Sequence, residues 1–385
     1  MRVVCVAGTR ADYMRVKPVA AALIRSSVDV AIVHTGSRYD AASSLSHFEA
    51  LGIGSPDHFL GCGAGTPAEQ TATAMTAFEP LLAELMPDVV AVVGDSNAAL
   101  ACAITAAKNG ALTAHIEAGL RSRDWSMPDE INRVVADRMS DYLFAPSLDA
   151  VDNLRREGYR EDQVMFVGSA LVDTLLVSRP HAEQRIGDVL ALHALKPGRF
   201  GLVALSRPAS IDEPEVLEEL LSAFDEVSRD LPLVVPVHAR VRSMLTALGM
   251  PAGVRMLPPL SYLDFIALEL SAALVLTDSS NVQEETTALG VPCLTLRDGT
   301  ERPATVTEGT NRLVGRHRQD IVGAVRKTLL KAPSPRRPVL WDGRSGERVA
   351  QAIIAGGAPS AHLRPTDVVI DVRTSPRAAE AVAAP

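Results

Sequence analysis

Short apolar segments alternate with longer helical patterns along most of the chain, and this alternation constrains the fold more than any other feature of the sequence. Segments such as RVVCVAG, DVVAVVGD and LVLTDS are rich in Val and Leu. Most precede a stretch with the apolar spacing of a helix, for example VKPVAAALIRS and VQEETTALG. Buried strands joined by helices are typical of a parallel sheet that is covered on both faces. The sequence therefore predicts an α/β fold.

The alternation restarts after Gly168, which predicts two similar α/β halves. The length of 385 residues exceeds what a single hydrophobic core usually supports, which agrees with two domains. We expect a first domain over residues 1–170 and a second over residues 171–330. A C-terminal helix within residues 331–355 is expected to pack back on the first domain. Residues 356–385 are rich in Ala and Pro and are expected to form a mobile tail.

The composition excludes several classes of protein. The formal net charge of -8 opposes nucleic-acid binding, which normally requires a basic face. The four cysteines are scattered without CxxC spacing, so buried reduced thiols are expected and a metal site is not. No apolar stretch approaches the length that crosses a bilayer, so we expect a cytoplasmic protein with no membrane partner.

Polar residues follow several of the predicted strands, where a doubly wound sheet places its ligand crevice. Gly8, Thr9 and Arg10 follow the first strand, where glycine permits close backbone approach and arginine can bind a phosphate bidentately. An ordinary turn with a solvated Arg10 is the alternative interpretation. His238 ends the strand LPLVVPVH at the same rim, and a positioning or packing role is the alternative to an acid–base role for this side chain.

Three carboxylates near the ends of the first-half strands suggest proton chemistry. Asp95 follows DVVAVVG, Glu117 lies in HIEAGLR and Glu130 lies in MPDEINR. Crowding and burial push carboxyl pKa values apart, so that a base and an acid can occupy one site. In the alternative interpretation, Asp95 caps the following helix and Glu130 pairs with Arg133 one turn later.

A phosphate site is indicated in the second half by TDSSNVQEE. Ser279, Ser280 and Asn281 are expected at the start of a helix, where free backbone N–H groups and the helix dipole attract an anion. Glu285, about one turn later, can accept hydrogen bonds from ribose hydroxyls. An ordinary Ser/Asn cap would explain the serines, but it would not explain the charged run from Arg297 to Arg302. A nucleotide diphosphate explains both features better.

The motifs, taken in order, resemble those of the UDP-N-acetylglucosamine 2-epimerase family of the glycosyltransferase B fold. The resemblance covers residues 1 to about 330 and implies two Rossmann-like domains that face a central cleft. It rests on GTR (8–10), HTGSRYD (34–40), GDS (94–96), HIEAGLR (115–121), PDEINR (128–133), PVHARVR (236–242), TDSSNVQEE (277–285), RDGTERP (297–303) and EGTNRLVG (308–315).

The resemblance implies a UDP-sugar in the cleft, with its diphosphate near Arg10 and Ser279 and its ribose on Glu285. Asp95, Glu117 and Glu130 would then serve proton transfer and stabilise the cationic sugar. The remaining pocket residues would be Arg121, Arg133, His238, Arg297 and Glu301. UDP is the leaving group, so neither a metal nor a redox cofactor is implied, and the family suggests a homodimer.

The chain also departs from the family pattern. Ser206 stands in LSRP where the family has a catalytic histidine, and a serine of ordinary pKa cannot replace it as an acid near neutral pH. The usual Ser-Gly-Gly reads Ser279, Ser280 and Asn281, which adds side chains where close approach is wanted. The lysine often found after GTR is replaced around Arg15 or Lys17.

The leading hypothesis is an epimerase that forms UDP-ManNAc, or a related product, by elimination and readdition of UDP. One alternative is a hydrolysing epimerase, or a glycosyl- or nucleoside-forming transferase of a specialised biosynthetic pathway. Another is a nucleotide-sugar-binding protein without turnover. Analysis of the products distinguishes these hypotheses.

Overall fold

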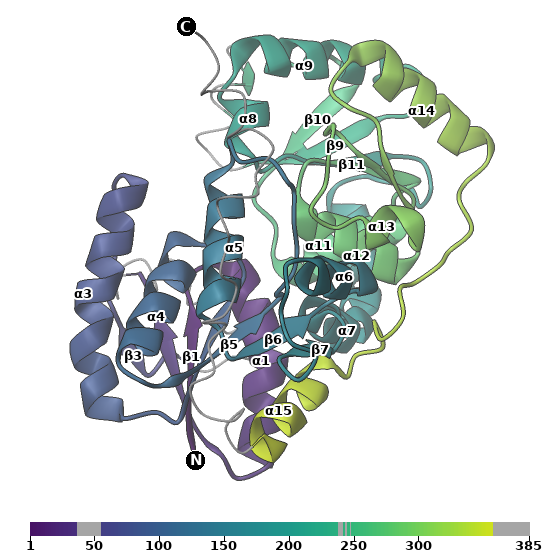
Figure 1. Cartoon of the computed structure of the whole chain (residues 1–385). Helices are drawn as coiled ribbons and strands as arrows, with labels where there is room; N and C mark the ends of the chain where they lie inside the picture. Colours follow the sequence, from purple (N-terminus) through teal and green to yellow (C-terminus); the bar gives the residue numbers. More distant parts are fainter. Residues whose placement is uncertain (37–54, 238–241, 243–244, 247, 357–385) are drawn as a thin grey trace, which may run out of the picture.

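The chain folds into two α/β halves, each built on a parallel sheet (Figure 1). The computed structural model describes residues 1–36, 55–237, 242, 245–246 and 248–356. The first sheet contains β1 (Arg2–Ala7), β2 (Asp29–His34), β3 (His58–Phe59), β4 (Val89–Val93), β5 (Leu112–Ile116), β6 (Tyr142–Ala145) and β7 (Val164–Phe166). The second contains β8 (Gly201–Ala204), β9 (Leu233–Pro236), β10 (Val254–Leu257), β11 (Leu274–Thr277), β12 (Cys293–Thr295) and β13 (Asn311–Leu313). The prediction of two parallel-sheet halves is confirmed.

The strand order places a topological switch point in each sheet. The first sheet has the order β3-β2-β1-β4-β5-β6-β7 and the second β10-β9-β8-β11-β12-β13. The chain reverses direction across the sheet between β1 and β4, and again between β8 and β11. The loops after these four strands therefore splay apart and leave a crevice at the carboxyl edge of each sheet.

Helices cover the sheets and carry the capping signals expected from the sequence. They are α1 (Arg10–Arg25), α3 (Pro67–Leu85), α4 (Asn97–Lys108), α5 (Pro128–Met139), α6 (Leu148–Arg156), α7 (Ala170–Leu192), α8 (Pro208–Ile211), α9 (Pro214–Ser228), α11 (Tyr262–Ser271), α12 (Ser280–Leu289), α13 (Ala304–Thr307), α14 (Arg318–Leu330) and α15 (Ser345–Ala355). At the start of α1, Thr9 accepts a hydrogen bond from the backbone of Asp12, and the Asp12 carboxylate accepts one from Thr9 in return. This capping box fixes the direction in which α1 leaves the first sheet.

The long helix α7 connects the two halves and packs on both of them. It contacts α1 of the first half and α11 and α12 of the second. Farther along the chain, α15 packs against α1, as Figure 1 shows where the yellow helix lies beside the purple one. The indole N–H of Trp341, in the segment that leads to α15, donates to the backbone carbonyl of Pro146 at 2.9 Å. The predicted tail from residue 357 onward lies outside the described residues. In the described part, no helix is both long and apolar enough to cross a membrane.

Gly168 allows the segment before α7 to approach the segment before α15 closely. Gly168 has a φ of +86°, and a Cβ added there would lie 2.1 Å from the carbonyl oxygen of Leu340. That distance is far inside van der Waals contact with a backbone atom, so the two segments would have to separate. The close approach therefore requires glycine.

We predict that Gly168→Ala lowers the free energy of unfolding by about 2–4 kcal/mol, because the left-handed backbone and the clash both oppose a side chain. Gly187→Ala is the matched control, since Gly187 lies exposed within α7 and a Cβ there meets nothing within 4 Å. This control should raise stability by about 0.5–1 kcal/mol. Denaturant unfolding of both variants tests the prediction, and equal stabilities for Gly168→Ala and wild type would contradict it.

Candidate functional site

The two switch points face each other, and two cavities lie between the halves. The first, which we call the Arg10 cavity, has a volume of about 420 Å³. Its lining includes Arg10 after β1, Ser206 after β8 and Glu285 on α12. The second, which we call the Arg297 cavity, has a volume of about 840 Å³. Ser206, Ser279 and Asn281 line both cavities, so the two join at the N-terminus of α12.

The Arg10 cavity combines a cation with a buried carboxylic acid. The guanidinium of Arg10 lies 5.8 Å from the centre of the Tyr262 ring. Burial raises the pKa of Glu285 to about 7, although the charge of Arg10 opposes the rise. A group that titrates near neutral pH can either accept or donate hydrogen bonds to a hydroxylated ligand.

The N-terminus of α12 offers backbone donors to both cavities. Ser279 is the N-cap residue, but its side chain makes no capping hydrogen bond. The first N–H groups of a helix have no intrahelical acceptor, and they lie at the positive end of the helix dipole. The backbone N–H of Ser279 already donates to the hydroxyl of Thr277 at 3.0 Å, so an anion at this terminus would use the N–H groups of Ser280 and Asn281 and the hydroxyl of Ser279.

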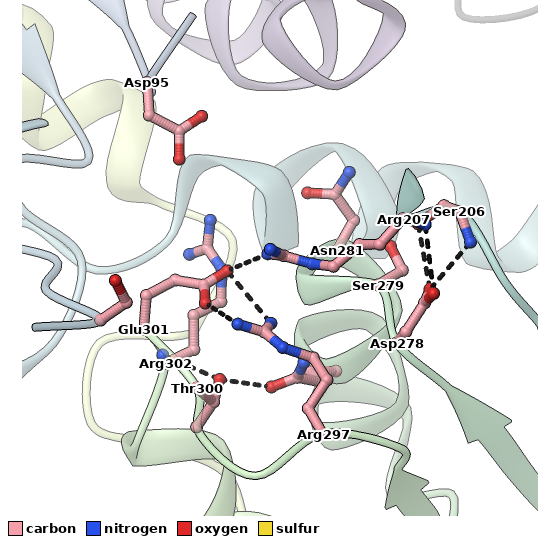
Figure 2. A network of polar contacts seen from close by, with 12 residues as sticks. Asp95, Ser206, Arg207, Asp278, Ser279, Asn281, Arg297, Thr300, Glu301 and Arg302 are labelled. Atoms are coloured by element: carbon pink, nitrogen blue, oxygen red, sulfur yellow. Dashed lines mark hydrogen bonds and ion pairs between the residues drawn. The ribbon is translucent and has the colours of Figure 1, made fainter. Parts of the chain in front are cut away.

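A buried ion cluster supports the Arg297 cavity, and Figure 2 shows how its side chains converge. Glu301 receives Arg297 at 2.7 Å and Arg207 at 3.0 Å. Burial alone would raise the pKa of Glu301, but the two guanidinium groups outweigh it and hold this pKa well below the usual range. Glu301 therefore stays ionised and fixes both arginines at the cavity wall.

Asp278 determines the position of Ser206. The backbone N–H and the hydroxyl of Ser206 donate to one oxygen of the Asp278 carboxylate, at 2.8 and 3.2 Å. The backbone N–H of Arg207 donates to the other oxygen at 3.1 Å (Figure 2). The loop after β8 is thus tied to the end of β11, and Ser206 lies at the junction of the two cavities.

On the first half, Arg133 brings two of the predicted carboxylates together. It lies 2.8 Å from Asp95 and 2.5 Å from Glu130. The buried Glu130 also accepts backbone hydrogen bonds from Ser122 and Arg123, each at 2.8 Å, so it holds the loop after β5 in place. The side chain of Asp95 stays 43% exposed.

The alternative roles of these carboxylates are resolved by the same geometry. The cap of α4 is Ser96, which accepts a hydrogen bond from Ala99 at 3.1 Å, and the helix does not use Asp95 for this purpose. Glu130 does pair with Arg133, one turn later on α5.

Burial raises the pKa of Asp129, another residue at the start of α5, and the charge of Asp95 adds to this rise. Asp129 lines the Arg297 cavity, although the sequence analysis did not single it out.

Glu117 belongs to a buried cluster that crosses between the halves. It lies 2.6 Å from Arg15 on α1 and 2.9 Å from Arg302 of the second half. Arg302 also pairs with Glu284 on α12. Burial disfavours the charge of Glu117, but Arg15 and Arg302 outweigh it and lower the pKa of Glu117 to about 2. Burial raises the pKa of Glu284 to about 7.

Arg121 forms its ion pairs within the first half and away from the other predicted pocket residues. It pairs with Glu157 at 2.7 Å and with Asp137 at 2.7 Å. Asp137 in turn contacts the His115 ring at 2.6 Å. This network supports β5 from within the first half. His238 lies outside the described residues.

Comparisons with known proteins agree on one family. A family model described as UDP-N-acetylglucosamine 2-epimerase matches residues 21–354. A UDP-N-acetylglucosamine 2-epimerase of Methanocaldococcus jannaschii is 36% identical over 365 residues, which cover 92% of this chain and 100% of the relative. A UDP-2,3-diacetamido-2,3-dideoxy-D-glucuronate 2-epimerase of Pseudomonas aeruginosa is 36% identical over 355 residues, covering 91% of this chain and 99% of the relative.

Solved structures give the same result. The structure of the M. jannaschii UDP-GlcNAc 2-epimerase in complex with UDP-GlcNAc and UDP matches with a TM-score of 0.83, covering 92% of this chain and 100% of that one at 36% identity. That of the Neisseria meningitidis enzyme bound to UDP-GlcNAc matches with a TM-score of 0.84, with the same coverage and 25% identity. The predicted glycosyltransferase B fold, with two Rossmann-like domains, is thereby confirmed.

Glu269 on α11 is a buried acid behind the Arg10 cavity. Its side chain is 0% exposed, and neither carboxyl oxygen has a hydrogen-bond partner among the described residues. Burial raises the pKa of Glu269 well above its usual value, the charge of Glu285 adds to the rise, and Arg10 opposes it. Burial therefore favours the protonated form of Glu269 in the folded protein.

We predict that Glu269 makes the protein less stable as the pH rises. The folded-state pKa lies above the unfolded one, so the stabilising contribution is complete below about pH 4.5 and is lost as the pH rises toward the folded-state pKa. Glu269→Gln removes this titration, so its unfolding free energy should fall less than that of wild type as the pH rises above about 4.5.

Denaturant unfolding at a series of pH values measures this effect. Glu218→Gln, on the exposed face of α9, is the control and should leave the pH dependence unchanged. Parallel curves for wild type and Glu269→Gln would contradict the prediction.

Proposed function

Because the chain belongs to the UDP-N-acetylglucosamine 2-epimerase family, we propose that it converts UDP-N-acetylglucosamine to UDP-N-acetylmannosamine. One observation carries the proposal: the N-terminus of α12, which suits an anion, adjoins two cavities whose lining on the first half includes Arg10 and the carboxylates Asp124 and Asp129. The M. jannaschii relative has been crystallised with UDP-GlcNAc and UDP, which supports the same ligand here.

The nucleotide would occupy the Arg10 cavity. The diphosphate binds at Ser279, Ser280 and Asn281, where backbone N–H groups and the helix dipole favour negative charge. Arg10 lines the same cavity and adds a positive charge, and Glu285 is placed to accept hydrogen bonds from the ribose hydroxyls. The sugar would then extend toward the Arg297 cavity, where Arg297 forms part of the wall and is held by Glu301.

The proposed reaction breaks and re-forms the bond between C1 and the UDP oxygen. A carboxylate removes the proton from C2, the C–H electrons form a C1=C2 double bond, and UDP leaves with the electrons of the C1–O bond. UDP then adds back to C1 while a proton is delivered to the opposite face of C2. UDP is the leaving group, so this scheme requires no metal or redox cofactor.

The carboxylates can be assigned separate tasks from their surroundings. Asp95 is the accessible member and would transfer the proton. Glu117, ionised beside two arginines, would stabilise positive charge on the sugar ring. Glu130 would hold Arg133 and the loop after β5, so that Asp95 stays aligned.

The remaining expectations stay predictions. Arg133 would keep its place beside Asp95, whereas Arg121 would support the first half through Asp137 and Glu157. The role of His238 at the rim is a proposal from the sequence alone. A homodimer in the cytoplasm is likewise a prediction, which light scattering and cell fractionation test.

We predict that the protein exchanges the C2 proton of its substrate for deuterium. Proton NMR with UDP-GlcNAc in D₂O should show UDP-ManNAc that carries deuterium at C2, because readdition draws the C2 proton from exchangeable groups. Release of free UDP together with ManNAc would instead show a hydrolysing enzyme. If UDP-GlcNAc binds but stays unchanged, the protein is a nucleotide-sugar-binding protein without turnover on this sugar.

We also predict that Asp95→Asn lowers kcat/KM by about 10²–10⁴-fold, the usual contribution of a general acid or base. Thermal stability should change little, since the Asp95 side chain is partly exposed. Asp225→Asn is the control, because the Asp225 side chain on α9 is 46% exposed, much like that of Asp95, and pairs with Arg229 four residues later. An Asp95→Asn variant with wild-type turnover would remove Asp95 from the mechanism.

A further inference from the structure

Arg15 forms a hydrogen bond from the first half to the nucleotide side of the second. Its Nη2 donates to the side-chain oxygen of Asn281 at 2.7 Å. The remaining nitrogens of the guanidinium stay on the first half, with Nε 2.6 Å from Glu117 and Nη1 donating to the carbonyl of Ala11 at 3.0 Å. The Arg15 side chain is 4% exposed, so water does not compete freely for these contacts.

Asn281 lies at the position where an anion would bind. It is the second residue of α12 and lines both the Arg10 cavity and the Arg297 cavity. In Figure 2 its side chain points away from the ion cluster of Arg297 and Glu301. The amide oxygen is therefore committed to Arg15, and the backbone of the same residue remains part of the helix N-terminus.

The chemistry of Arg15 allows it to serve two partners at once. A guanidinium carries five N–H donors in a planar fork, whereas a lysine ammonium is a compact point charge. Arg15 can thus hold Asn281 with one arm while Nε faces Glu117. A lysine at the same position would have to choose between partners that lie in different directions.

We propose that Asn281 is a positioning residue that acts through Arg15 on Glu117, and so couples the anion site of α12 to a carboxylate of the other half. The inference rests on the proposed function. When Asn281 holds Arg15, the guanidinium stays against Glu117 and, together with Arg302 and opposite Glu284, keeps the carboxylate charged. When that contact is lost, Arg15 can turn away, and Glu117 becomes easier to protonate.

The test is a double-mutant cycle with Asn281→Gly and Arg15→Lys, read from the pH dependence of kcat/KM for UDP-GlcNAc. Each single variant should shift the acidic limb to higher pH, because a weaker cation beside Glu117 raises the pH at which its charge is lost. In the Arg15→Lys background, Asn281→Gly should add no further shift, since the contact is already absent.

Two further variants separate coupling from a simple structural effect. Asn281→Gln keeps an uncharged amide oxygen that can accept from Arg15, so its acidic limb should match wild type even though its longer side chain crowds the anion site and raises KM. Asn109→Gly, at the exposed end of α4, is the matched control and should leave both quantities unchanged. A merely structural role for Asn281 would not produce this split between the acidic limb and KM.

Additive shifts in the cycle, or an acidic limb in Asn281→Gly that matches wild type, would overturn the inference. If wild type does not turn over UDP-GlcNAc, the proposed function fails, and the same cycle is measured on UDP affinity by calorimetry. There the two substitutions should again be non-additive, with at least about a fivefold coupling in Kd. Additive effects on UDP binding would overturn the inference independently of the proposed function.

Discussion

The junction between the halves depends on a buried ionic cluster in which two ion pairs dock against each other. The first half brings Arg15 with Glu117, and the second brings Arg302 with Glu284. Burying an isolated charge costs several kcal/mol, but each half here carries a pair that is already neutral. Docking adds the cross contacts from Arg302 to Glu117 at 2.9 Å and from Arg15 to Glu284 at 3.8 Å. The halves can therefore meet in one specific arrangement and still separate without leaving a lone buried charge.

The same cluster gives its two carboxyl groups different protonation states. Both are enclosed, yet the pKa of Glu117 falls to about 2 and that of Glu284 rises to about 7. The difference follows from geometry: Glu117 has an arginine on each side, whereas Glu284 has Arg302 close by and Arg15 farther away. Two carboxyl groups with separated pKa values place a fixed charge beside a group that titrates near neutral pH in one enclosure. Any movement between the halves changes both values together.

Much of the fold follows directly from the sequence, because apolar runs and helical spacing are local properties. The segment RVVCVAG contains β1, and the helix expected over VQEETTALG is α12. The loops after β1, β4, β8 and β11 also converge as parallel topology requires. What the sequence could not show is pairing over long separations. The sequence analysis assigned a role to Glu285 and none to its neighbour Glu284, and it noted Arg15 only as a substitute for the lysine that the family often has. Nothing local in the sequence places Glu284 or Arg15 beside Glu117.

Arg121 illustrates the same limit from the opposite side. It follows a strand that leads to the cleft, and the family resemblance assigned it to the pocket. Its guanidinium turns instead to Asp137 and Glu157, which lie on the next two helices of the same half. Spacing predicts which edge of the sheet a residue occupies, but the direction of a long side chain depends on the charges that surround it.

The position of Ser206 shows how the tasks are divided between the halves. Its hydroxyl donates to Asp278, which is fully buried, so this donor is already used within the second half. A serine hydroxyl of ordinary pKa does not act as a general acid near neutral pH. The arginines at the same wall are held by Glu301. The second half therefore presents fixed donors and charges that suit binding. The accessible carboxylate Asp95 stands on the first half, so the proton transfer and the nucleotide binding that we propose would meet where the two halves face each other.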